Sequence, residues 1–127
     1  MCFIIHPDYP NPLVAEQDII CFKIGKKAES NLDDQKFFSQ YRSYVYRLGE
    51  LQPKVELFLD RWIGHSILSV QIGYHSYHPL NPSIRAEYVA NSPYCLVRCI
   101  IPKGSQYYYN PSDREYVSDQ IIAQKIL

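Results

Sequence analysis

The sequence predicts a single small α+β domain, built mostly on an antiparallel or mixed sheet of about six strands with one or two helices. Two observations favour the sheet: short β-rich runs recur between Gly and Pro residues, and Tyr, which favours strands, occurs 12 times. One observation favours a helix, because a helix-capping signal stands between two strand-like runs. The 127 residues are the length of one ordinary domain.

The N-terminal part supplies two strand-like runs. Cys2-Phe-Ile-Ile-His6 is the first, and the prolines of 7–12 predict an extended connection after it. Ile19–Ile24 is the second strand, with Gly25 as its end and a polar loop over 26–34.

The sequence pattern in the middle of the chain predicts secondary structure less clearly. Alternation of aromatic and other side chains predicts a strand at Tyr41–Leu48. Val55–Ile63 carries apolar residues with charges between them, which fits either a short helix or a strand. Ile67–Ile72 is another β-like run and leads directly into Gly73–Tyr77.

The helix signal follows. Asn81-Pro-Ser83 places a capping residue before a proline, which predicts a helix from about Pro82 to Ala90. Tyr94–Ile101 then has the strongest strand pattern of the chain.

The C-terminal part adds two strands around a turn. Gln106–Tyr109 is a short aromatic strand, and Asn110-Pro-Ser-Asp113 is a turn signature. Glu115–Leu127 is expected to be the final strand.

The charge balance excludes one class of partner. Lys plus Arg and Asp plus Glu each number 13, so no basic excess supports non-specific binding of nucleic acid. No apolar run reaches the ~18 residues of a membrane span, and the N-terminus does not resemble a signal peptide. We therefore expect a cytoplasmic protein without a membrane partner.

The four cysteines are not spaced as a metal site. Cys95 and Cys99 lie four apart in a strand-like run, so both should point to one face. With Cys2 and Cys21 they are expected to be buried, reduced and free of metal. His65, His75 and His78 could supply a metal site, but no acidic residue lies near them, and surface or capping roles are favoured.

A candidate ligand site combines two segments. Tyr74, His75, Ser76 and Tyr77 leave a strand just before the predicted helix, whose N-terminus favours phosphate. Glu115 follows a turn and also stands at a strand end. If both ends share one sheet edge, these residues line a cleft suited to a nucleotide. The alternative is that the tyrosines pack in the interior and that Glu115 is an edge charge.

Five segments together resemble a family of short uncharacterised proteins from phages and mobile elements of gut Bacteroides. The family has no established activity, so the resemblance implies a mobile-element origin and nothing more. The segments are Cys2–His6, Ile19–Lys23, Gly73–Tyr77, Cys99–Gly104 and Glu115–Asp119.

The C-terminal segments also resemble ADP-ribosyltransferases. The order Gly73–Tyr77, helix, strand and Glu115-Tyr-Val is similar to the poly(ADP-ribose) polymerase type. The resemblance implies NAD as cofactor, Glu115 as the catalytic carboxylate, and Tyr74 or Tyr77 beside the nicotinamide. It fits an active enzyme or a relative that has lost catalysis.

Three functions follow from the sequence. The favoured one is a non-enzymatic protein that binds a host protein or a nucleotide-type ligand, without a cofactor. The second is an ADP-ribosyltransferase-like enzyme that uses NAD. The third is a self-associating structural protein, with Tyr107–Tyr109 and exposed strands as its contacts, so a homo-oligomer stays open.

Overall fold

The computed structural model describes residues 3–27, 36–39, 45–61, 68–84 and 94–127. Strands account for 54% and helical residues for 2%, so the predicted α+β class with one or two helices is wrong and the described chain is nearly all β.

The helix predicted from about Pro82 to Ala90 lies mostly outside the described residues. The Asn81 side-chain oxygen does accept a hydrogen bond from the Ser83 backbone N–H at 2.8 Å. Such a bond forms at turns as readily as at helix starts. Ser83 and Ile84 are helical, and the rest of the predicted helix, 85–90, lies outside the described residues.

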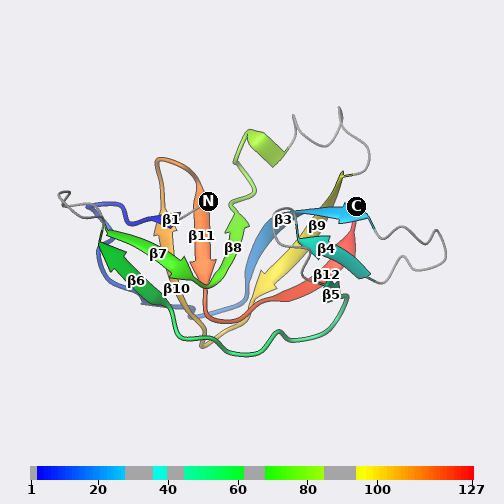
Figure 1. Cartoon of the computed structure of the whole chain (residues 1–127), viewed down its shortest axis with the longest axis horizontal. Coiled ribbons are helices and arrows are strands. Elements are labelled where there is room, and N and C mark those ends of the chain that lie inside the picture. The colour runs from blue at the N-terminus through cyan, green and yellow to red at the C-terminus, as the bar shows by residue number, and fades with distance from the viewer. Residues whose placement is uncertain (1–2, 28–35, 40–44, 62–67, 85–93) are drawn as a thin grey trace.

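Twelve strands form two antiparallel sheets in the described chain (Figure 1). They are β1 (Phe3–Ile4), β2 (Leu13–Val14), β3 (Ile19–Lys27), β4 (Lys36–Ser39), β5 (Val45–Arg47), β6 (Phe58–Arg61), β7 (Leu68–Ile72), β8 (Tyr74–Tyr77), β9 (Tyr94–Ile101), β10 (Gln106–Asn110), β11 (Glu115–Ser118) and β12 (Ile122–Ile126). The small sheet has the order β1-β7-β6. The large sheet has the order β12-β9-β3-β8-β11-β10-β2, with β4 on β3 and β5 on β4.

Several predicted strands are confirmed and others have different ends. β9 has the predicted bounds, and Val55–Ile63 contains a strand, β6, in its described part. Gly25 does not end β3, which continues to Lys27 because its backbone pairs with both β9 and β4 there. The expected final strand is two strands, β11 and β12, with Asp119 in the bend between them.

One glycine joins the two sheets. Gly73 alone separates β7 of the small sheet from β8 of the large one, and the chain bends sharply between them (Figure 1). Its φ of +154° is a conformation that glycine adopts without strain. This bend brings the Tyr74–Tyr77 segment into the large sheet.

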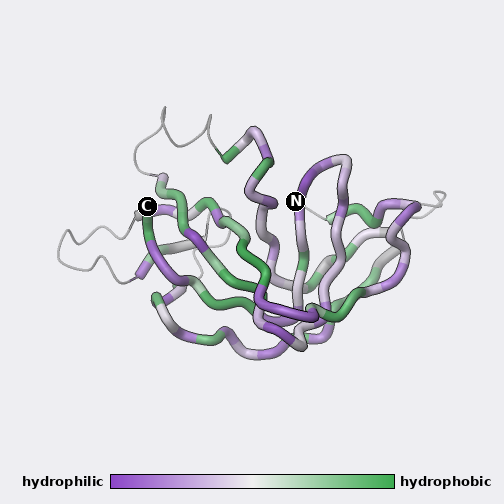
Figure 2. The backbone as a smooth tube through the Cα atoms, turned by 180° about the vertical axis from the view of Figure 1, so that it is seen from behind, coloured by the Kyte–Doolittle hydropathy of each residue, from purple (hydrophilic) through white to green (hydrophobic). Residues whose placement is uncertain are grey.

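The large sheet is strongly curved (Figure 2). Its residues contribute side chains to two hydrophobic cores. On β11, Tyr116 packs in the larger core and Val117 in the smaller one, because successive side chains point to opposite faces. The smaller core also holds Phe3 and Val70 from the small sheet. Strand β11 is thus covered on both sides.

The larger core contains thiols and an amine. Cys21, Cys95 and Cys99 are free and buried, and Cys95 and Cys99 share one face of β9, as predicted. Cys21 lies directly opposite Cys99. The Lys23 side chain is also buried; its Nζ donates a hydrogen bond to the His75 carbonyl at 2.5 Å and lies 5.2 Å from the centre of the Tyr46 ring.

Burial shifts the pKa of these groups in opposite directions. Desolvation raises the pKa of Cys21 from 9.0 to about 11, and the nearby Ser76 and Lys23 offset this only in part. Desolvation lowers the pKa of Lys23, because the interior disfavours its charge.

We expect the unfolding free energy to fall by about 2–3 kcal/mol between pH 9 and 11 through Cys21 alone. A folded pKa above the unfolded one gives stability that is complete below pH 9 and is lost as the pH rises through the folded value. The lowered pKa of Lys23 acts against this, since it makes stability rise with pH up to its unfolded value. Urea denaturation at several pH values measures the slope, and Cys21→Val should make it more positive. An unchanged slope in that variant would show that Cys21 does not carry the effect.

Candidate functional site

The two segments of the predicted site are neighbouring strands. β8 and β11 pair antiparallel, with Tyr77 opposite Glu115 and His75 opposite Val117. Side chains that are opposite each other in such a pair share a face. His75, Tyr77 and Glu115 therefore lie on one face of the sheet, where Tyr77 and Glu115 are direct neighbours.

The other two predicted residues lie on the opposite face. Ser76 is opposite Tyr116 and is buried in the larger core, close to Cys21. Tyr74 donates a hydrogen bond from its hydroxyl to the Pro53 carbonyl at 2.6 Å. Ser76 and Tyr74 thus cannot meet a ligand that contacts Glu115 from the other face.

A groove of about 640 Å³ contains Glu115. It runs between the turn at 81–83 and the turn that links β10 to β11. Its described lining residues are Ile4, Asn81, Pro82, Ser83, Ser112, Asp113, Arg114 and Glu115. Tyr77 is not among them, but adjoins Glu115 through the strand pairing.

Glu115 is the half-buried acid of this groove. Burial raises its pKa, and the negative charge of Asp113 raises it further. A carboxyl in this setting accepts hydrogen bonds when ionised and donates one when protonated. It can therefore hold hydroxyl or N–H groups of a ligand.

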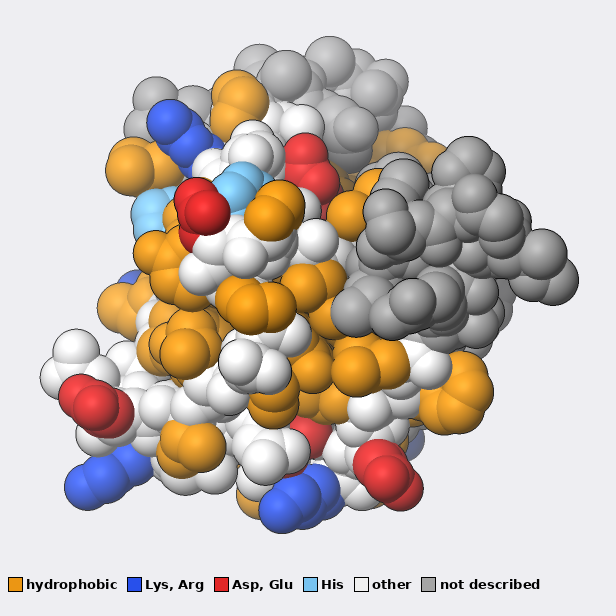
Figure 3. All heavy atoms as spheres, turned by 90° about the vertical axis from the view of Figure 1, so that its left-hand side faces the viewer, with side chains coloured by type: hydrophobic (Ala, Val, Ile, Leu, Met, Phe, Trp, Pro, Cys, Tyr) orange, Lys and Arg blue, Asp and Glu red, His pale blue; other side chains and the backbone are white. Residues whose placement is uncertain are grey.

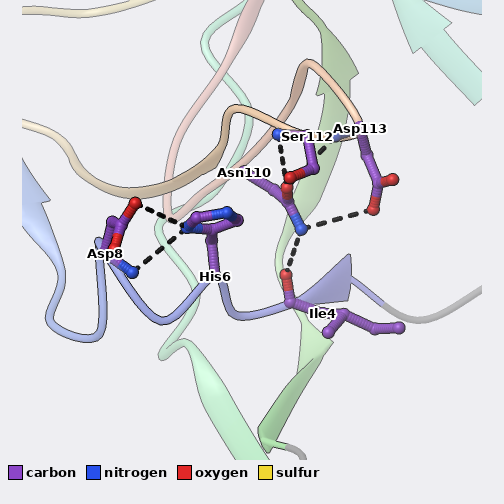
Figure 4. Close-up of polar contacts among 6 residues, drawn as sticks. All are labelled: Ile4, His6, Asp8, Asn110, Ser112 and Asp113. Atoms are coloured by element: carbon purple, nitrogen blue, oxygen red, sulfur yellow. Dashed lines mark hydrogen bonds and ion pairs between the residues drawn. The ribbon is translucent and has the colours of Figure 1, made fainter.

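Two asparagines fix the walls of the groove. Asn81 donates from its side-chain nitrogen to the carbonyls of Asp113 and Arg114, at 2.8 and 3.2 Å. Asn110 donates to the Ile4 carbonyl at 2.8 Å and accepts from the backbone N–H groups of Ser112 and Asp113 (Figure 4). The turn, the N-terminal strand and the 81–83 segment are thereby held together.

Arg114 is held in an uncommon backbone conformation at the same turn. Its φ is +52°, a left-handed value that residues other than glycine adopt less often. Its guanidinium donates to the Leu80 carbonyl at 2.8 Å, and its own carbonyl accepts from the His78 N–H. The side chain is thus tied to the groove wall.

The predicted phosphate site lies only partly within the described residues. That prediction needed the N-terminus of a helix, and only the short turn through Ser83 and Ile84 is described. The acids Asp113 and Glu115 both line the groove and repel an anion. Hydroxyl-bearing or cationic groups fit this lining better than phosphate.

Two of the described histidines, His78 and His6, have local hydrogen-bonding roles. His78 accepts from the Leu80 N–H at 3.0 Å, and His6 accepts from the Asp8 N–H at 3.1 Å (Figure 4). His78 is therefore a capping residue, as favoured from the sequence. His65 lies outside the described residues, and within them no three potential metal ligands lie together.

An aromatic cluster was not predicted as a unit. Tyr107 and Tyr109 of β10 share a face and contact Tyr116 of β11, with ring centres 6.0 and 5.0 Å away. His78 and Tyr9 complete the cluster around Tyr109. Alternate spacing in the Tyr107–Tyr109 run was the only available signal, because the register that adds Tyr116 is long-range.

Hydrophobic side chains spread over the side of the molecule that carries β6 and the N-terminal segment (Figure 3). On these segments, Tyr9, Leu13, Phe58 and Leu59 are exposed by 37–54%. In the described part of the chain, no helix is long and apolar enough to cross a membrane.

No protein-family model, curated protein or solved structure matches this chain.

Proposed function

We propose that this protein is a non-enzymatic, cytoplasmic binding protein, encoded by a phage or mobile element, that recognises a nucleotide-type ligand in the Glu115 groove. The observation that carries the proposal is the position of Glu115, a half-buried acid in a groove of about 640 Å³. A pocket of this size accommodates a nucleoside.

Glu115 suits the ribose of such a ligand. An ionised carboxylate accepts two hydrogen bonds, and a ribose offers two neighbouring hydroxyl donors. The Asn81 and Asn110 networks support the groove by fixing its walls before a ligand arrives, which lowers the entropy cost of binding. Tyr77 supports the proposal as the aromatic neighbour of Glu115.

We expect adenosine, or NAD or ADP-ribose bound with a ribose at Glu115 and its phosphates outside the groove, to raise the thermal midpoint of the wild-type protein. A ligand at 100 times its dissociation constant adds about 2.7 kcal/mol of stability, which corresponds to several degrees. Glu115→Gln and Tyr77→Ala should reduce the shift, while Glu50→Gln, at an exposed acid outside the groove, should keep it.

A 2′-deoxy analogue separates ribose recognition from base recognition. Loss of the shift with that analogue supports the carboxylate–diol contact. A shift that survives Glu115→Gln contradicts the proposal. If no nucleotide binds, a host protein becomes the expected partner. If the protein also sediments as an oligomer, the expected partner is a second copy of the chain, bound through the apolar side in Figure 3.

An ADP-ribosyltransferase-like enzyme is the second candidate, and the pairing of Tyr77 with Glu115 favours it. In that role NAD is the substrate and Glu115 the catalytic carboxylate. Release of nicotinamide from NAD, abolished by Glu115→Gln, would establish the enzyme. Binding of NAD without release of nicotinamide would support the non-enzymatic binding protein instead.

A further inference from the structure

A second groove lies apart from the Glu115 groove and shares none of its described lining residues. Its volume is about 460 Å³. It runs between the 54–57 segment and β10, with the bend after β11 at its base. The described lining residues are Pro12, Lys54, Val55, Glu56, Leu57, Gln106, Tyr108 and Asp119.

Asp119 is the buried acid of this groove. Its side chain is only 2% exposed. One carboxylate oxygen, Oδ1, accepts a hydrogen bond from the Gln106 N–H at 3.0 Å. The backbone of Asp119 is also engaged, because its N–H bonds the Gln106 carbonyl and its carbonyl accepts from the Val55 N–H. The carboxylate is therefore held in one position.

The second oxygen of Asp119, Oδ2, accepts no hydrogen bond from the described residues. Among the described residues its one ionic neighbour is Lys54, whose Nζ is 4.0 Å away. That distance is too long for a hydrogen bond. Oδ2 is not among the fully buried side-chain atoms that lack a partner, so it is open to the groove. The Oδ2 atom is thus set up to receive a positive hydrogen-bond donor.

Lys54 forms only a weak ion pair with Asp119 Oδ2. Its side chain is 70% exposed, so most of it stands in water. Ion pairs of exposed lysines contribute little and exchange readily. An incoming cation can replace Lys54 at Oδ2 without disturbing the backbone around Asp119.

The walls select the kind of cation. Pro12, Val55 and Leu57 are apolar and suit an aliphatic stem, and Glu56 adds a second negative charge at the rim. An anion would meet two acids. A guanidinium is planar, is weakly hydrated and donates several hydrogen bonds to a carboxylate.

We propose that this groove binds an arginine side chain of a partner polypeptide, with the guanidinium on Asp119 Oδ2 and the aliphatic stem against Val55 and Leu57. Lys54 is the intramolecular competitor for the same oxygen. This site is independent of the nucleotide groove, so either can fail without the other.

The test is a titration of the ¹⁵N-labelled protein with N-acetyl-arginine N-methylamide, followed by amide chemical shifts. The amides of Gln106 and Val55, which bond Asp119, should shift and saturate at about millimolar probe. The matching citrulline compound has the same shape without the charge and should cause no saturable shift.

Two variants decide the roles of the side chains. Lys54→Met keeps the stem and removes the competing charge, so it should tighten probe binding about two- to fivefold. Lys103→Met, at an exposed lysine outside the groove, should leave the affinity unchanged. Asp119→Asn retains an oxygen for the Gln106 N–H and should abolish saturable binding.

The outcomes separate cleanly. Equal shifts with the arginine and citrulline compounds, or weaker binding after Lys54→Met, would overturn the proposal. Because Lys54 is exposed, the Lys54→Met variant should fold. Its affinity for the probe therefore tests the proposal even if Asp119→Asn fails to fold.

Discussion

Replacing Gly73 with alanine is expected to lower the unfolding free energy by about 2–4 kcal/mol. A Cβ at this position would lie 2.5 Å from Val117 Cγ2 and 2.8 Å from Leu57 Cδ2. Both distances are shorter than any real contact of a Cβ atom. The backbone φ of +154° adds strain for a residue with a side chain.

The clash with Val117 is hard to relieve because Val117 is held in place. Val117 is fully buried in the smaller core, and its strand, β11, is paired on both sides by β8 and β10. Leu57 packs against that core. A shift of Val117 would disturb the junction where the two sheets meet.

Gly104→Ala is the matched control for backbone strain. Gly104 has a φ of +88°, and nothing lies within 4 Å of the Cβ that alanine would add. Its cost should be about 1 kcal/mol, from backbone conformation alone. Urea denaturation of both variants gives the difference. Equal costs would mean that Val117 and Leu57 give way and that the close packing at Gly73 is not essential.

Local patterns predicted strands well, whereas the helix signal is borne out only for its first residues, the rest lying outside the described chain. Tyr94–Ile101 was found with the expected ends, because its alternation reflects one face against the core. The Asn81-Pro-Ser83 signal is equally local, but it specifies only the first hydrogen bond of a turn or helix. Gly25 is predicted to end a strand, yet β3 continues past it because strands on both sides pair with it.

The candidate site depended on register, which no local pattern contains. The sequence placed Glu115 and the Tyr74–Tyr77 segment at strand ends, and the structure pairs these strands with Tyr77 opposite Glu115. It also turns Ser76 and Tyr74 to the opposite face, which follows from the two-residue period only once the register is known. Asp119 gave no signal at all, because an isolated Asp in a sequence is usually exposed.

Replacing Asn110 with alanine is expected to lower the unfolding free energy by about 2–4 kcal/mol. The side chain is 4% exposed and makes several bonds at once. Its oxygen accepts from the N–H groups of Ser112 and Asp113, at 2.9 and 3.1 Å. Its nitrogen donates to the Ile4 carbonyl, 106 residues away in sequence (Figure 4).

Alanine removes all of these bonds and leaves their partners in a part-buried setting, where unmet polar groups are costly. The loss should be seen in two ways. Urea denaturation should show the reduced stability, and amide exchange should quicken in β1 and β7, since Ile4 pairs with Ser69. Asn11→Ala, at an exposed asparagine, is the control and should change neither. If exchange in β1 and β7 stayed slow while the turn at 112–113 loosened, the bond to Ile4 would not be what holds the N-terminal strand to the groove.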